Sequence, residues 1–425
     1  MRKYTRTISG VTPVAVMVEP GSCPGNCVYC PNHSDAPRSY TALSPAVIRA
    51  RFCGYDANKQ VNKRLETLSE MGHATDKVEL IIMGGTFMSY PPAYRYKFIK
   101  DCYDALNGTE SPADGLEAAK RQNETASHRC VGLCIETRPD WCSEKQIDTM
   151  LEYGATRVEL GVQTLDDDIY LLVRRGHKVA DVAQATKALK ERGLKVHYHW
   201  MPGLPGSTPE KDLEMSRELF NDSRFCPDGI KIYPTMVVMG SELEQWFNEG
   251  RYKPYDDMTM TDLIADIKAG VPPYVRISRV LRDIPVKYVI GGLKESMRNG
   301  LKQRMAEQGT ECRCVRCREV GHRMSSKRRI GQPQLKRIDY EASGGKEIFL
   351  SFEDADGTLF GLLRMRVQVK PLEGISGEKE KNICVIRELH VYGTEVPLSA
   401  VNPESAQHKG FGKALLAEAE RIASN

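Results

Sequence analysis

The sequence predicts an α/β protein in which an incomplete parallel (β/α) barrel is followed by a smaller α+β domain. Apolar runs alternate with amphipathic stretches from about residue 14 to residue 270, as in parallel strands joined by crossover helices. The pattern changes near residue 271 to a basic segment, and near residue 338 to a hairpin-like rhythm. These changes divide the chain into an expected barrel domain at 1–270, a linker at 271–337 and a second domain at 338–425.

Six near-continuous apolar runs are the expected barrel strands: PVAVMVEP, VELIIMGG, VGLCIET, RVELGVQT, KVHYHWMPG and GIKIYPT. The helices expected between them are the amphipathic stretches 92–106, 143–153, 179–192 and 209–220. In such barrels the functional loops follow the carboxyl ends of the strands. In the second domain, EIFLSFEDADGTLFGLLRMRVQ predicts a hairpin with a turn near Asp356 and Gly357. A strand in CVIRELHVYG and a helix from Gly410 follow it.

The composition is that of an ordinary globular protein, with 41% hydrophobic and 27% charged residues among 425. No apolar run approaches the ~20 residues that span a bilayer, and no apolar core follows the basic N-terminus. We therefore expect no membrane contact and no signal peptide. Of the 13 cysteines, six fall in two clusters, which indicates metal sites in a reducing, cytoplasmic protein rather than a disulfide framework.

The first cysteine cluster lies directly after the first predicted strand. SCPGNCVYCPNH places Cys23, Cys27 and Cys30 on a loop rich in glycine and proline. Three thiolates can hold three irons of a 4Fe–4S cluster and leave the fourth iron open to a small molecule. The alternative is a zinc site completed by His33. Because the loop lies at the functional end of the barrel, its cysteines are candidate catalytic residues.

The Cys-x3-Cys-x2-Cys spacing, with Tyr29 before the last cysteine, resembles the radical S-adenosylmethionine (radical SAM) superfamily. In that superfamily the amine and carboxylate of S-adenosylmethionine occupy the open iron. The resemblance implies that Gly84, Gly85 and Thr86 in MGGTF meet the methionine amine, since glycine lets the backbone approach a ligand. Thr86 departs from the superfamily, in which glutamate is commoner at the third position.

Polar residues end the next predicted strands and point to the same mouth of the barrel. Glu136 and Arg138 in ETRPD and Gln163 in GVQT are candidates to hold ribose or carboxylate groups. Buried ion pairs at the strand ends are the alternative. Lys231 and Tyr233 in KIYPT are either donors that line the barrel or packing residues.

A glycine loop near the C-terminus predicts an anion site. QHKGFGKALLAEAERIA places Gln407, Gly410 and Gly412 in Q-x-x-G-x-G order directly before a predicted helix. Backbone N–H groups at such a helix start suit the pyrophosphate of coenzyme A. The preceding strand IRELHVYG strengthens this interpretation, because an acetyltransferase-type fold has a strand at that place. The alternative is an ordinary glycine-capped helix start.

The second cysteine cluster lies within the basic segment. Cys312, Cys314 and Cys317 are followed by His322, a spacing that fits structural zinc, with reduced thiols as the alternative. Residues 271–337 contain 17 Lys or Arg and 5 Asp or Glu, whereas the whole chain carries a net charge of only +4. Such a segment is typical of a surface for a polyanion, here RNA. The candidate RNA-binding residues are Arg276, Arg279, Arg282, Lys327, Arg328 and Arg329.

Taken together, CVYCP, DKVELIIMGGTFMSYP, ETRPDWC, TRVELGVQT, MPGLPGST, KIYPT, CRCVRCRE and RELHVYG resemble the catalytic subunit of Elongator and its stand-alone archaeal and bacterial relatives. The resemblance implies a radical SAM partial barrel and an acetyltransferase domain of the GNAT type. It also implies a tRNA-modifying enzyme that uses acetyl-CoA and S-adenosylmethionine to place a carboxymethyl group on the wobble uridine. The residues that would reach acetyl-CoA are Lys77, Glu388, Leu389, His390, Val391, Phe411, Gly412 and Lys413.

The expected partners are the anticodon stem-loop of tRNA and a second copy of the chain, without the accessory Elongator subunits. The family continues past the helix in which this chain ends at Asn425, so we expect the second domain to be incomplete. Two other functions compete with this interpretation. One is a protein lysine acetyltransferase whose iron–sulfur domain is structural, and the other is a non-catalytic RNA-binding module held together by zinc.

Overall fold

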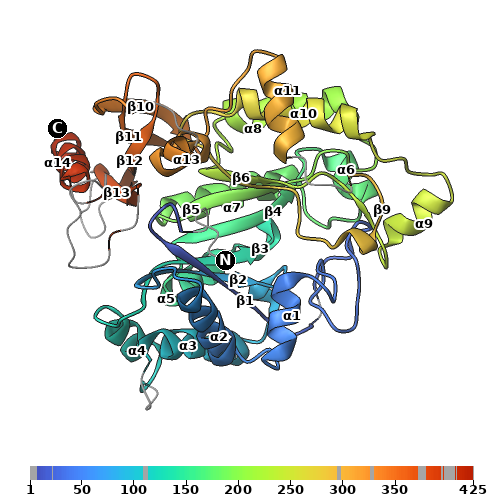
Figure 1. Cartoon of the computed structure of the whole chain (residues 1–425), viewed down its shortest axis with the longest axis horizontal. Helices are drawn as coiled ribbons and strands as arrows, with labels where there is room; N and C mark the ends of the chain where they lie inside the picture. The colour runs from blue at the N-terminus through green and yellow to red at the C-terminus, as the bar shows by residue number, and fades with distance from the viewer. Residues whose placement is uncertain are drawn as a thin grey trace.

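The computed structural model describes residues 7–21, 23–108, 113–293, 298–325, 330–371, 380–393, 396, 407 and 409–424. Its larger part is a sheet of seven parallel strands, which confirms the predicted incomplete barrel (Figure 1). In order across the sheet these are β1 (Thr12–Met17), β2 (Lys77–Met83), β3 (Arg129–Thr137), β4 (Arg157–Gln163), β5 (Lys195–Trp200), β6 (Gly229–Ile232) and β8 (Arg276–Val280).

The two faces of these strands differ in polarity. Side chains alternate between the faces of a strand, so Val78 and Leu80 of β2 are fully buried in the core beneath the helices. Glu79, between them, lines the inner face, as do Arg157 and Glu159 of β4. The predominantly apolar strands therefore also contain charged residues, and the side chains of these residues line the inner face of the barrel.

Helices connect the strands and cover the outside of the sheet (Figure 1). They are α1 (Pro45–Phe52), α2 (Ala57–Glu70), α3 (Pro92–Asn107), α4 (Leu116–Asn123), α5 (Glu144–Glu152), α6 (Asp167–Leu172), α7 (Val179–Glu191), α8 (Pro209–Asn221), α9 (Glu242–Asn248) and α10 (Asp257–Gly270). Local sequence fixes several starts: Ser143 and Gln146 form a capping box on α5, and Thr208 caps α8. Among the described residues, no helix has the length and apolar character needed to cross a bilayer.

The basic segment contributes a strand to the barrel and also connects the barrel to the second domain. Residues 276–280 form β8, which pairs with β6 as the last strand of the sheet. The chain then forms β9 (Val289–Gly291), which pairs with β7 (Val237–Val238), and three helices, α11 (Arg298–Glu307), α12 (Val315–Arg318) and α13 (Val320–Ser325). Arg276 and Arg279 therefore lie on a barrel strand.

The second domain is a four-stranded antiparallel sheet of β10 (Gln334–Ala342), β11 (Gly345–Glu353), β12 (Leu359–Pro371) and β13 (Glu380–Val391). The predicted hairpin is present as β11 and β12, with Asp356 and Gly357 between them. The sequence analysis missed β10, which is exposed along most of its length. Helix α14 (Phe411–Ala423) packs on this sheet through Leu415 and Ala419.

A buried charge cluster, defined here as Asp228, Arg387, Glu347, Arg364 and Lys190, joins the two sheets. Asp228, just before β6, accepts two hydrogen bonds of 2.7 Å from Arg387 of β13, and both side chains are fully buried. Arg387 also pairs with Glu347 of β11 at 2.6 Å. Because Asp228 precedes its strand, the second sheet lies against the amino ends of the barrel strands.

Candidate active site

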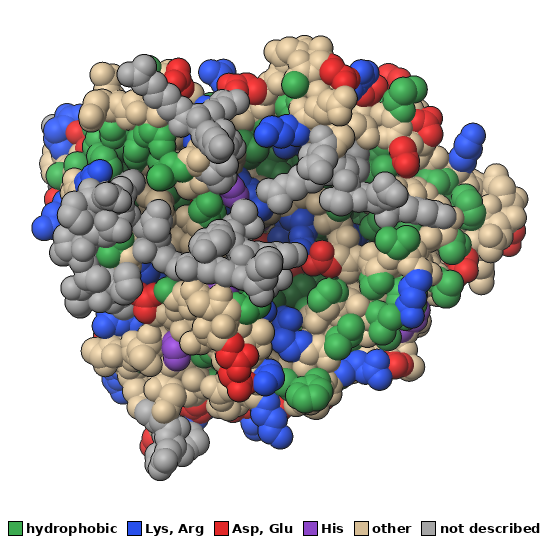
Figure 2. Space-filling view, viewed as in Figure 1, with side chains coloured by type: hydrophobic (Ala, Val, Ile, Leu, Met, Phe, Trp, Pro, Cys, Tyr) green, Lys and Arg blue, Asp and Glu red, His purple; other side chains and the backbone are tan. Residues whose placement is uncertain are grey.

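One cavity of about 2,350 Å³ extends along the inside of the barrel. At one end it is lined by Glu388–Val391 of β13 and by residues 410–413. Glu79, Arg157 and Lys231 line its middle, and Leu281 and Arg282, beyond the carboxyl end of β8, line its other end. Figure 2 shows Lys and Arg side chains inside the hollow at the centre of one face of the molecule. The cavity thus connects the second domain with the mouth of the barrel.

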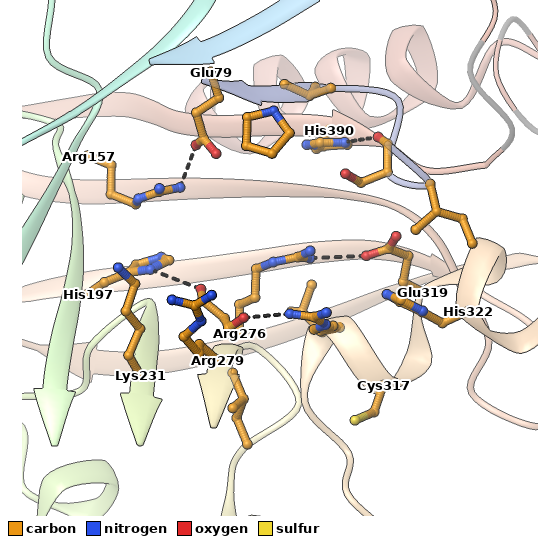
Figure 3. Close-up of a pocket in the computed structure, with 18 of the residues that line it drawn as sticks. Glu79, Arg157, His197, Lys231, Arg276, Arg279, Cys317, Glu319, His322 and His390 are labelled. Carbon is orange, nitrogen blue, oxygen red and sulfur yellow. Dashed lines mark hydrogen bonds and ion pairs between the residues drawn. The ribbon is translucent and has the colours of Figure 1, made fainter. Parts of the chain in front are cut away.

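Alternating charges line the barrel interior, and Figure 3 shows one of the pairs, Arg157 with Glu79. Arg157 donates a 2.5 Å hydrogen bond to Glu79 and lies 3.5 Å from Glu159. Lys231 pairs with Glu159 and lies 3.6 Å from Glu136. Burial would raise the pKa of Glu159, but Lys231, His199 and Arg157 hold it well below its usual value. The interior is therefore crossed by paired charged groups, and the sequence analysis singled out two of them, Glu136 and Lys231.

The cysteine loop follows β1, as predicted. Cys27 is buried, and its Sγ accepts a 3.5 Å hydrogen bond from Arg175, which is also buried. The pKa of Cys27 lies well below its usual value because Cys30 donates a hydrogen bond to it and because Arg175 is nearby, and together these interactions outweigh the effect of burial. The pKa of Cys30 is raised well above its usual value by its hydrogen bond to Cys27, by burial and by the charge of Cys27. No pattern in the sequence marks Arg175, which lies 148 residues from Cys27.

The ligand atoms that the structure describes around the first cysteine loop are not gathered as a single zinc ion would require. A tetrahedral zinc site holds its sulfurs roughly 3.8 Å apart, as Zn–S bonds of about 2.3 Å require. Among the described residues, Cys23, Cys27, Cys30 and His33 do not form a set of ligand atoms within 4.8 Å of one another. Cys23 instead lies 3.7 Å from Thr86 Oγ1. This geometry disfavours the zinc alternative with His33.

Around the loop, backbone and side-chain features leave room for a ligand. Gly84 has a φ of +143°, and a Cβ there would lie 2.1 Å from Val18, so only glycine fits. Gln163 ends β4 at a φ of +78°, an unusual conformation for a residue with a side chain. Its Oε1 and the Nη1 of Arg138 are buried without a hydrogen-bond partner. Unpaired buried polar atoms are costly, so each of these two atoms is a candidate to bind a polar cofactor.

The other strand-end candidates have protein partners. Arg138 pairs with Asp140 at 2.9 Å and donates to the carbonyl of Arg175 at 2.8 Å. Glu136 accepts a 2.8 Å hydrogen bond from Tyr40. Arg138 and Glu136 therefore both lie at the carboxyl end of β3 and take part in ion pairs, as the alternative interpretation expected.

The second cysteine cluster is compact. The sulfurs of Cys312, Cys314 and Cys317 lie within 4.8 Å of one another, as a single metal ion requires. Hydrogen bonds from Cys312 and Cys317 lower the pKa of Cys314 well below its usual value, against the effect of burial. The ring of His322 lines the same cavity but lies outside this set of ligand atoms. The structure therefore gathers three of the four predicted ligands.

The residues that the resemblance assigns to acetyl-CoA lie together. Lys77, Glu388–Val391, Gln407 and 410–413 all line the one cavity. Gln407 is buried and donates a 3.2 Å hydrogen bond to the carbonyl of Val391, so it holds the glycine loop against β13. Gly410 precedes α14 with a φ of +86°. Lys77, at the start of β2, reaches the carbonyl of Val396 at 3.0 Å.

Of the six candidate RNA-binding residues, three lie in the described part of the chain, and each of these three has a partner within the protein. Arg276 pairs with Glu319 at 3.2 Å, and Arg279 pairs with Asp283 at 2.5 Å. Arg282 donates to the backbone and side chain of Ser39. All three line the cavity. The other candidates, Lys327, Arg328 and Arg329, lie outside the described residues.

Comparison with known proteins places the chain among well-defined relatives. The model of the radical SAM superfamily matches residues 20–219, and that of the Radical_SAM C-terminal domain matches residues 227–307. The chain is 62% identical over 423 residues to a protein of Dehalococcoides mccartyi named tRNA uridine(34) acetyltransferase. The alignment covers 100% of this chain and 92% of that protein. The chain is 43% identical to Homo sapiens Elongator complex protein 3, over 99% of this chain and 79% of the relative.

A solved structure agrees with these sequence matches. The archaeal Elp3 of Methanocaldococcus infernus, with an N-terminal deletion of residues 1–46, superimposes with a TM-score of 0.85 at 44% identity. The match covers 98% of this chain and 92% of that one, so it includes both sheets.

Proposed function

The chain belongs to the family of tRNA uridine(34) acetyltransferases and Elongator complex protein 3, within the radical SAM superfamily, and from this membership we propose that it modifies uridine 34 of tRNA. The product is a 5-carboxymethyl uridine, with acetyl-CoA as the source of the two carbons. The observation that carries this proposal is the continuous cavity. It is lined at one end by the glycine loop before α14 and at the other by residues beyond the carboxyl ends of the barrel strands.

The cofactors are assigned to residues by position. A 4Fe–4S cluster would be held by Cys23, Cys27 and Cys30, and S-adenosylmethionine by Gly84, Gly85, Thr86, Glu136, Arg138 and Gln163. Acetyl-CoA would be held by Lys77, Glu388, Leu389, His390, Val391, Gln407, Gly410, Phe411, Gly412 and Lys413. When bound, the cluster and S-adenosylmethionine supply the one-electron chemistry that removes a hydrogen atom from a carbon.

The chain's own residues supply position, charge and protection from water. Arg175 lies beside Cys27 and favours its thiolate form, which is the form that binds iron. The ion pairs of Arg157 and Lys231 keep the barrel interior organised without a ligand. With tRNA and acetyl-CoA bound, fewer bulk-solvent molecules would reach a reacting carbon inside this cavity.

The test of the proposed function is product analysis with the full chain. Anaerobically reconstituted protein is incubated with tRNA, acetyl-CoA and S-adenosylmethionine. We expect 5-carboxymethyluridine in the digested tRNA and 5′-deoxyadenosine in solution, each dependent on all three substrates. Acetyl-lysine formed without S-adenosylmethionine would instead support the lysine acetyltransferase, and tRNA binding without either product would support the non-catalytic module.

We also propose that Cys312, Cys314 and Cys317 hold a structural zinc ion. Replacing Cys314 with serine is expected to reduce the zinc content from about one ion per chain to near zero, because Cys314 is the buried central thiolate of the three. The thermal midpoint of unfolding should fall with it, since structural zinc stabilises the fold. Elemental analysis and thermal unfolding measure both quantities.

The matched control for zinc is Cys384→Ala, which removes a partly exposed thiol of β13 outside the cluster. Its zinc content should equal that of the wild type. Equal zinc in Cys314→Ser and the wild type would overturn the assignment.

The basic segment is proposed to bind tRNA through phosphates. Replacing Lys327, Arg328 and Arg329 together with alanine is expected to weaken binding and reduce the slope of log K against log salt concentration by about 2, because three phosphate contacts on a single strand contribute about 0.7 each. Filter binding of tRNA at several salt concentrations measures this slope.

The control is the triple variant Lys97→Ala, Arg224→Ala and Arg251→Ala, which also removes three positive charges. These three side chains are more than half exposed and lie outside the basic segment. The control triple should keep the wild-type slope. If both triples gave the same slope as the wild type, the basic segment would be only a solvated face.

A further inference from the structure

His390 of β13 is held in one tautomer by the N-terminal segment. Its Nε2 lies 2.8 Å from the backbone carbonyl of Ser9, 381 residues away. A carbonyl can only accept a hydrogen bond, so Nε2 must carry the proton and donate it. In the neutral imidazole, Nδ1 is then the unprotonated nitrogen with a free lone pair.

The Nδ1 atom is accessible from the cavity. His390 lines the cavity, and within the described residues its only hydrogen bond to the protein is the one to Ser9. Nδ1 is not among the buried side-chain atoms that lack a partner, so solvent reaches it. In Figure 3, His390 and Glu319 extend from facing sides of the cavity.

The ring is also fixed in orientation. It stacks on Tyr392 with centroids 4.3 Å apart and planes 18° from parallel. Tyr392 in turn receives a 3.4 Å hydrogen bond from Arg276, which pairs with Glu319. On the other side, Ile8 packs against Gly321, where a Cβ would lie 2.7 Å from Ile8, and this contact holds the segment that carries Ser9. An imidazole with a fixed tautomer and plane is prepared to accept a proton at one place.

The proposed reaction needs such a base. The acetyl carbons leave coenzyme A as a carboxylate, so water must attack the thioester carbonyl carbon. The C–S bond then breaks, and one proton of the water must be taken up. We propose that His390 Nδ1 is the general base that removes this proton, after which the coenzyme A thiolate receives it. His390 has a free basic nitrogen among the residues assigned to acetyl-CoA, and this inference rests on the proposed function.

Burial keeps His390 neutral when the enzyme works. Burial lowers the pKa of His390, and Arg276 lowers it further. The hydrogen bond to Ser9 and the carboxylates of Glu388 and Glu319 act in the opposite direction and do not outweigh burial. The base is therefore deprotonated through the neutral pH range and loses function only as the solution becomes acidic.

The test is His390→Gln, whose side-chain amide still donates to Ser9 but has no basic nitrogen. We expect release of the coenzyme A thiol during tRNA modification to slow by about 10²- to 10⁴-fold, as is typical for the loss of a general base. Thiol release is compared at saturating acetyl-CoA, and binding of a non-hydrolysable thioether analogue is measured beside it, so that weaker binding is not mistaken for loss of the base. The acid limb of the pH–rate profile should disappear, and added imidazole should restore part of the rate in His390→Ala.

The matched control is His128→Gln, because His128 also hydrogen-bonds a backbone carbonyl, that of Thr75 at 2.8 Å, but lies outside the cavity. Formation of 5′-deoxyadenosine by His390→Gln separates this inference from the proposed function. If 5′-deoxyadenosine forms and thiol release keeps the wild-type rate and pH profile, His390 is not the base and the proposed function stands. If the wild type itself forms no 5′-deoxyadenosine, the proposed function fails.

Discussion

Replacing Cys27 with serine is expected to abolish the formation of both 5′-deoxyadenosine and modified tRNA. Cys27 is the buried member of the N-terminal cysteine cluster, and Arg175 and Cys30 hold its pKa well below that of an ordinary thiol. The hydroxyl of serine stays protonated near neutral pH and is a poor ligand for iron. Iron and sulfide analysis under anaerobic conditions should show about four of each per chain in the wild type and a much lower content in Cys27→Ser.

The control for this experiment is again Cys384→Ala, which lies outside both cysteine clusters. It should retain wild-type iron and activity. Wild-type formation of 5′-deoxyadenosine by Cys27→Ser would remove the N-terminal cluster from the mechanism. Circular dichroism shows whether the variant keeps its fold, so that lost activity is not mistaken for unfolding.

Replacing Asp228 with asparagine is expected to lower the free energy of unfolding by about 3–5 kcal/mol, because it leaves the buried charge of Arg387 without its bidentate partner. The amide keeps the size of the side chain, so the change reports charge rather than volume. Denaturant unfolding followed by circular dichroism measures the difference.

Asp228 also predicts a dependence on pH. Burial would raise its pKa, but Arg387 and Lys190 outweigh burial and hold it well below the usual value. A carboxyl whose pKa is depressed on folding stabilises the protein above its unfolded pKa of about 3.9. That contribution is lost as the pH falls through the folded-state value, so the wild type should lose stability in acid while Asp228→Asn loses less.

A surface pair provides the comparison for Asp228. Glu249 lies 2.9 Å from Arg251, and both side chains are more than half exposed. Glu249→Gln should cost less than about 1 kcal/mol. Equal effects of Glu249→Gln and Asp228→Asn on stability would contradict a special role for the buried charge cluster.

The order of the strands along the chain and the positions of the motifs could be predicted from the sequence because both depend on local patterns. The cysteine loop follows β1, the glycine turn follows β2, and four expected helices correspond to α3, α5, α7 and α8. The hairpin of β11 and β12 was marked by its Asp-Gly turn. In each case the signal lies within about ten residues of the feature.

Contacts between distant segments could not be predicted in this way. Arg175 resembles any other loop arginine until the fold brings it to Cys27. The pairing of Asp228 with Arg387 spans 159 residues, and the sequence suggests no reason to bury either charge. Glu79 and Arg157 lie within runs that were interpreted as strands buried on both faces, whereas in the fold one face of each strand lines the cavity. Strand β10 lacks an apolar pattern because most of it is exposed.

The contacts of Arg387 with Asp228 and Glu347 decide which parts of the system are able to move. A hinge between the barrel and the second sheet would strip these groups of their partners while keeping them away from water, so such an opening is disfavoured. We therefore expect the two sheets to move together as one rigid body. If acetyl-CoA binds as proposed, the reach that brings its acetyl group to the nucleoside would come from the flexible pantetheine arm and from the RNA rather than from movement of a protein domain.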